Sequence, residues 1–158
     1  MRNSRALIAG AAVLAGATGV GGIALADGST EHLRTTLSGA EEVPPADPDG
    51  RGTARLKIDT ESGEICWRLR FHDIATPFAA HIHGPDAPAG VNAPVFVGLF
   101  PPVADPDALE RGHAKGCTTA SVAMARAIVA EPGEFYVNIH NAEFLGGAIR
   151  GQLRRLHH

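Results

Sequence analysis

Three histidines are the residues of this sequence whose types and spacing suit metal chemistry. His81 and His83 alternate within residues 80–85. Successive side chains of an extended strand point to opposite faces, so these two imidazoles leave one face about 7 Å apart and can reach the same ion. His140 ends another alternating segment, two residues after Asn138. Because three neutral imidazoles suit Zn²⁺ or Cu²⁺, we predict a divalent metal site formed by all three histidines.

A structural role for the same residues is the alternative interpretation. In that case, His81 and His83 are partly buried and bonded to loop carbonyls, and His140 caps the last hairpin. Asn138 either orients an imidazole or satisfies a loop backbone group. His72 and His113 are metal-ligand candidates of lower rank.

Short strands must position these residues. Alternation and turn residues predict strands over 32–38, 52–59, 64–72, 78–83, 94–100, 117–121, 134–140 and 148–153. Residues 94–100 are apolar throughout, so we expect a central strand. Residues 101–116 require no regular structure, and 122–131 form a short helix with Ser121 as N-cap. Many short strands and little helix predict an all-β, antiparallel sandwich or barrel.

The N-terminus has the pattern of a secretory signal peptide. Arg2 and Arg5 precede the apolar run 6–26, which ends in Ala-Leu-Ala. An uncleaved membrane anchor is the alternative, because the run is nearly long enough to span a bilayer. We expect a signal peptide at 1–26 and a single domain at 27–158 that is secreted, either extracellular or periplasmic.

Export also determines the interpretation of the two cysteines. In an oxidising compartment, Cys66 and Cys117 are expected to form one disulfide. The alternative is a pair of free thiols on a metal ion, although the cysteines lack the close spacing of zinc sites.

Arg150 is the cation that we expect to be buried, since its neighbours in the sequence are apolar residues and glycine. A buried guanidinium needs a carboxylate or several carbonyls. Glu42, or its neighbour Glu41, is the predicted partner in a structural ion pair, and anion binding by Arg150 is the alternative. The formal net charge is −3 and the sequence has no basic stripe, so we expect no nucleic acid partner.

Four segments together resemble a known family. Residues 37–45, 80–85, 135–140 and 147–153 are similar, in order and spacing, to segments of the CHRD (chordin) domain, and the resemblance extends from about residue 33 to 153. It implies a secreted, immunoglobulin-like or Greek-key β-sandwich or barrel of the kind found in exported bacterial proteins. It implies little about activity.

Our functional prediction is a binding module that holds copper or zinc and recognises an unknown protein or small ligand. We find no nucleophile elbow, phosphate-binding loop or paired acid and base. One alternative is a copper-dependent enzyme similar to superoxide dismutase, suggested by the His-x-His pair, a later histidine and Arg150. No histidine and aspartate cluster follows His83 to form a second metal site, however. A purely structural extracellular domain is the other alternative. Membrane contact would require the N-terminal segment to be retained.

Overall fold

One antiparallel sheet forms most of the protein in the computed structural model, which describes residues 29–100 and 106–156. The predicted signal peptide lies outside these residues. Within them, the strands are β1 (Thr30–Ser38), β2 (Arg51–Asp59), β3 (Glu64–His72), β4 (Pro77–His83), β5 (Val95–Phe100), β6 (His113–Thr119), β7 (Tyr136–Asn141), β8 (Ile149–Gln152) and β9 (Arg154–Arg155).

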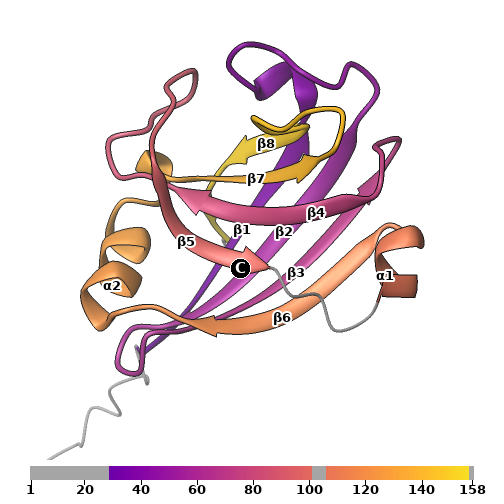
Figure 1. Ribbon diagram of the computed structural model, residues 1–158. Coiled ribbons are helices and arrows are strands. Elements are labelled where there is room, and N and C mark those ends of the chain that lie inside the picture. Colours follow the sequence, from indigo (N-terminus) through magenta and orange to yellow (C-terminus); the bar gives the residue numbers. More distant parts are fainter. Residues whose placement is uncertain (1–28, 101–105, 157–158) are drawn as a thin grey trace, which may run out of the picture.

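The strands pair in the order β5-β4-β7-β8-β1-β2-β3-β6, and β9 also pairs with β1. The two ends of this path, β5 and β6, contact each other, so the sheet curls into a barrel with one seam (Figure 1). The predicted all-β, antiparallel fold is confirmed in its barrel form.

Two short helices and two 3₁₀ turns connect the strands. They are α1 (Pro106–Glu110), α2 (Val122–Ala130), η1 (Gly39–Glu41) and η2 (Pro132–Glu134). The Ser121 hydroxyl accepts a hydrogen bond from the backbone N–H of Met124, which confirms the predicted N-cap. Ala125 and Ile128 of α2 are buried against the barrel core. Among the described residues, no helix has the length and apolar character needed to cross a membrane.

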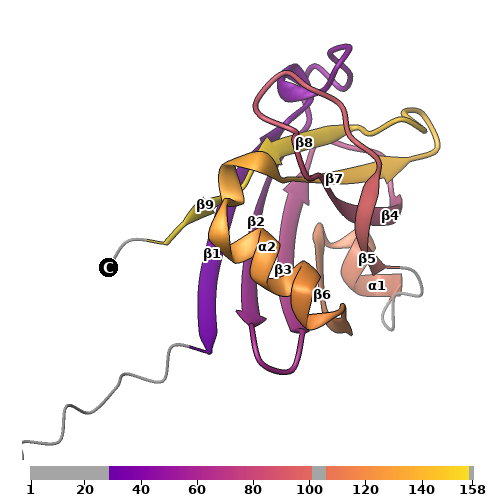
Figure 2. The same cartoon turned by 90° about the vertical axis from the view of Figure 1, so that its left-hand side faces the viewer.

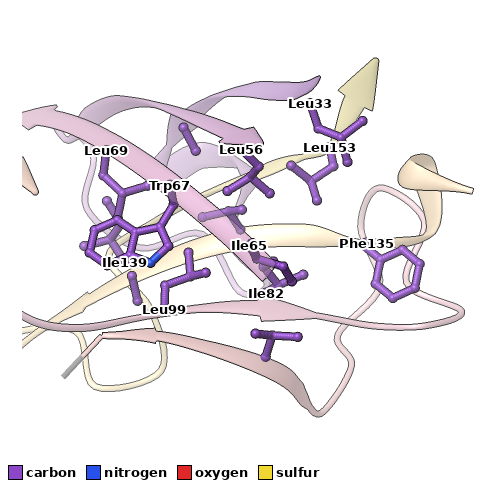
Figure 3. Close-up of a cluster of buried hydrophobic side chains, with 14 of the residues drawn as sticks. Leu33, Leu56, Ile65, Trp67, Leu69, Ile82, Leu99, Phe135, Ile139 and Leu153 are labelled. Carbon is purple, nitrogen blue, oxygen red and sulfur yellow. The ribbon is translucent and has the colours of Figure 1, made fainter. Parts of the chain in front are cut away.

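Alternate side chains of the strands fill the interior of the barrel (Figure 3). In β3, Ile65, Trp67 and Leu69 are buried, whereas the residues between them lie on the outer face, as the alternation predicts. The rings of Trp67 and Phe100 have centroids 5.7 Å apart, so β3 and β5 touch across the interior. Gly116 of β6 makes room for the indole, because a Cβ there would lie 2.7 Å from a ring carbon.

Two local predictions were wrong. Residues 94–100 were expected to be central, but β5 is an end of the strand path and Val95 is exposed. The curvature of the barrel explains this difference, since it buries the inward residues Val97 and Leu99 without a strand on both sides. Residues 101–116 were expected to be irregular, yet α1 and the start of β6 lie there.

The disulfide prediction is confirmed. Cys66 of β3 and Cys117 of β6 are directly opposed, with Cα atoms 3.9 Å apart, and their sulfurs are bonded. The interpretation as two free thiols on a metal is therefore wrong. The bond ties β6, the last strand of the path, to its neighbour.

Candidate metal site

The register between β4 and β7 brings the three histidines together. His81 is paired with Asn138, and the Cα partner of His140 is Ala79, two residues before His81. Directly paired residues of antiparallel strands project from the same face. The intervening residues, Ile82 in β4 and Ile139 in β7, are fully buried in the core. The histidines and Asn138 therefore lie on the outer face of the barrel.

This outer face is covered by loops and not by solvent. Every residue of β7 is buried, including Asn138 at 1% exposure and His140 at 7%. Residues 84–94 fold back over the sheet, because Gln152 donates a hydrogen bond to the Ala87 carbonyl at 2.6 Å. The turn at 142–148 covers His140 from the other side. His81 is only partly buried, so the cluster is reached from its side.

The ring nitrogens converge to within bonding reach of one ion. His81 Nδ1 lies 3.0 Å from His140 Nε2, and one nitrogen of each of the three rings lies within 4.8 Å of the others. Two nitrogens on a tetrahedral zinc ion, each at about 2.0–2.1 Å, are roughly 3.3 Å apart. Small adjustments of the rings would thus let His81, His83 and His140 bind the same ion.

Backbone carbonyls determine which nitrogens are available. His83 Nδ1 donates to the Ala93 carbonyl at 2.9 Å, and His140 Nδ1 donates to the Leu145 carbonyl at 2.9 Å. A neutral imidazole carries one proton, so the Nε2 atoms of both rings carry lone pairs directed into the cluster. This is how metal-binding histidines are usually oriented. The structural interpretation, hydrogen bonding to loop carbonyls, is thus compatible with metal binding.

Asn138 lies between the two Nε2 atoms. Its Oδ1 is 3.0 Å from Nε2 of His83 and 3.0 Å from Nε2 of His140. An oxygen and two lone-pair nitrogens are all acceptors, so a cation among them, or rotation of the amide to present its Nδ2, is needed.

Burial keeps the three histidines neutral. Desolvation, followed by repulsion from His140 and His83, lowers the pKa of His81 to about 4. Desolvation also lowers the pKa of His83 and of His140, although their hydrogen bonds to carbonyls oppose this effect. Neutral imidazole is the form that binds metal, so the cluster needs no deprotonation near pH 7.

Arg150 supports the loop that covers the site. Its guanidinium donates to Asn92 Oδ1 at 2.8 Å and to the Val91 carbonyl at 3.2 Å. Its Cζ also lies 4.2 Å from the centroid of the Tyr136 ring, which stacks on the His83 ring at 4.7 Å. Arg150 is 2% exposed, so the prediction that it is buried is confirmed.

Glu42, the predicted partner of Arg150, is also buried, whereas Glu41 is exposed. The Oε1 atom of Glu42 accepts no hydrogen bond. Burial raises the pKa of Glu42 to about 7, against the attraction of the Arg150 charge. The two groups interact electrostatically, and the ion pair between them stays a prediction.

The lower-ranked candidates lie on other strands. His72 ends β3, and His113 begins β6. Among the described residues, the other group of potential ligands is Glu64, Cys66 and Cys117. The sulfurs of Cys66 and Cys117 are bonded to each other in the disulfide.

Sequence reasoning missed the contribution of Tyr136 and of the loop residue Asn92. One signal was available in β7, whose outward positions carry Tyr, Asn and His but no Lys, Glu or Asp. A strand face exposed to water usually carries charged residues. Uncharged polar residues on both sides of Asn138 therefore indicate a covered face.

Comparison with known proteins gives one result. The model of the CHRD domain matches residues 33–153, which is most of the chain. No match is found among curated proteins or among solved structures.

Proposed function

The chain belongs to the CHRD domain family, and on that premise we propose that it is a binding module in which His81, His83 and His140 hold one Zn²⁺ or Cu²⁺ ion. The observation that carries the proposal is the convergence of one nitrogen from each of the three rings to within 4.8 Å of the others, with two of the rings held by loop carbonyls. The predicted signal peptide and the disulfide support a location outside the cytoplasm.

Each residue has a defined part in this proposal. His83 and His140 offer Nε2, and His81 offers Nδ1 in the tautomer that carries its proton on Nε2, while the carbonyls of Ala93 and Leu145 fix two of the rings. An ion held there would act as a Lewis acid and would link β4 to β7. Asn138 Oδ1, or a water reached past His81, suits the fourth position.

Isothermal titration of Zn²⁺ and of Cu²⁺ into untagged protein tests the proposal. Because His157 and His158 are two further imidazoles that would compete for the added metal, all variants carry alanine at both positions. We expect one ion per chain. We also expect His81→Ala to weaken binding at least about 100-fold, since even residues that only orient a ligand are worth 10–100-fold.

Matched controls are His72→Ala and His113→Ala, which remove a histidine outside the cluster and should leave binding unchanged. His81 is the sharpest position for the test, because it is partly exposed and its hydrogen bond is to His140. Equal affinity in His81→Ala and the parent protein, or equal losses in the controls, would contradict the proposal.

The pH dependence of binding provides a second prediction. Protons compete with the metal only when the pH falls to the pKa of the ligands, and burial lowers the pKa of all three histidines, that of His81 to about 4. We expect the affinity to change little between pH 7.5 and about 6 and to fall steeply below about pH 5. Titration across this range checks it. A steep loss that begins near pH 6.5, the ordinary pKa of histidine, would contradict it.

A further inference from the structure

A row of basic side chains crosses the outer face of the barrel wall, and none of them is paired with an acidic residue on a neighbouring strand. Each member is the Cα partner of the next one on the neighbouring strand, in the order Arg154 of β9, Arg34 of β1, Arg55 of β2, Arg68 of β3 and Lys115 of β6. All five side chains are exposed, and directly paired residues share a face. Figure 2 shows these strands in this order. This cation row places a positive charge about every 5 Å across five strands.

The row is not neutralised by carboxylates. Among residues 29–100 and 106–156, none of the five cations takes part in an ion pair. The nearest acids along the outer positions of β2 and β3 are Asp59 and Glu64, at the end where the hairpin turns. Asp59 accepts hydrogen bonds from the turn backbone. Like charges directly opposite each other destabilise a sheet, so folding alone does not account for the row.

Two hollows lie along the row. One, of about 470 Å³, is lined by Arg55, Arg68 and Arg70 among others, and the second, of about 540 Å³, by Arg68, Arg70 and Lys115 among others. These volumes are within the range of about 300–1,000 Å³ that is typical of ligand sites. Their cationic walls suit anionic groups that repeat along a chain.

We propose that the cation row binds a linear acidic polysaccharide through its carboxylate or sulfate groups. The exposed large apolar residues of the described chain are Val43, Phe78, Val91, Val95 and Leu145, and none lies on these five strands. The wall therefore exposes no Phe, Tyr or Trp ring on which the bases of a single-stranded nucleic acid could stack. It also has no apolar side chain to insert into a membrane. A polysaccharide requires neither, and export would bring the chain to such polymers.

Binding of polygalacturonate and of heparin, measured by titration in EDTA so that the histidine cluster holds no metal, tests the proposal. Dextran is the neutral polysaccharide control. We expect binding to both acidic polymers that weakens with salt, and none to dextran. Arg55→Gln and Arg68→Gln should each reduce affinity about threefold, and the double variant about tenfold, because each removes one charge contact.

Arg126→Gln is the matched control, since Arg126 is exposed on α2, outside the row. It removes the same charge and should change affinity less than about twofold. Thermal unfolding excludes loss of structure as the cause: Arg55→Gln and Arg68→Gln should melt no lower than the parent protein, because they relieve repulsion.

Three outcomes would overturn the proposal. One is an equal loss of affinity in Arg126→Gln and Arg68→Gln, which would mean that only net charge matters. The second is tighter binding to single-stranded DNA of the same charge than to either acidic polysaccharide. The third is tighter binding to phosphatidylserine vesicles than to either polymer, which would assign the row to a membrane surface.

Discussion

Replacement of both Cys66 and Cys117 by alanine should lower the free energy of unfolding by about 4 kcal/mol. The disulfide closes a loop with a sequence separation of 51 residues, which includes β4, β5 and α1. In the chain-entropy account, the loss comes from the greater freedom of the unfolded chain. Since domains are stable by only about 5–15 kcal/mol, this change would remove a large share of the total stability.

Urea unfolding followed by the fluorescence of Trp67, the one tryptophan of the chain, measures the change. The parent protein under reducing conditions is the control, because it loses the bond without losing the side chains. It should unfold at nearly the same urea concentration as the double variant. A loss below about 1 kcal/mol in both would mean that the β3–β6 ladder alone holds β6 in place.

Local alternation was enough to predict the strands that have one buried face. In β3, large apolar residues alternate with polar residues over nine positions, and the predicted range 64–72 agrees with the structure. Alternation was not enough for β6, where Gly116 faces inward and Cys117 outward. The small inward residues there are dictated by Trp67 on the neighbouring strand, and a single strand's own sequence does not contain that information.

The candidate site was predictable in its members but not in its setting. His81, His83 and His140 were selected because each lies near the end of a strand, and the β4–β7 register does bring them together. The sequence suggested loop carbonyls near the histidines only as an alternative interpretation, because the cover by residues 84–94 depends on contacts such as that between Arg150 and Asn92, 58 positions apart. It is this cover that lowers the histidine pKa values.

The cation row is a feature that the linear sequence did not reveal. The absence of a basic stripe was inferred from the linear sequence, in which Arg34, Arg55, Arg68 and Lys115 are well separated. Pairing in register makes them neighbours, so the barrel does carry a basic row, while the expectation of no nucleic acid partner stays a prediction. Charge patterning on a sheet is set by register, and register depends on turn lengths and on the buried face.

Glu42→Gln should stabilise the protein by about 3 kcal/mol above pH 7 and change its stability little below pH 4.5. Burial raises the pKa of Glu42 from its ordinary 4.5 to about 7. A carboxyl whose pKa is raised by folding contributes most to stability below its unfolded pKa, and the contribution is lost as pH rises through the folded pKa. The rise in pKa from 4.5 to about 7 corresponds to roughly 3 kcal/mol of unfolding free energy, which the parent protein loses when Glu42 ionises. The glutamine side chain of the variant has no charge to bury, so the variant does not lose this free energy.

The measurement is the difference in unfolding free energy between Glu42→Gln and the parent protein from pH 4 to 8, in EDTA. This difference isolates Glu42, because the histidines His81, His83 and His140 have the opposite effect and occur in both proteins. Their lowered pKa values reduce stability as the pH falls below 6.5. Glu41→Gln is the matched control, since Glu41 is exposed and its replacement should have little effect at any pH.

The sign of this difference in unfolding free energy also shows which groups compensate the buried charge of Arg150. Its guanidinium donates to Asn92 and to the Val91 carbonyl, and these neutral partners, with the Tyr136 ring, would hold the charge without help from Glu42. If the predicted ion pair dominates instead, Glu42→Gln would leave a buried cation without its counterion. The variant would then be less stable than the parent protein at pH 8, by about 3–5 kcal/mol, the usual loss when one partner of a buried pair is removed. That outcome would contradict the raised pKa of Glu42.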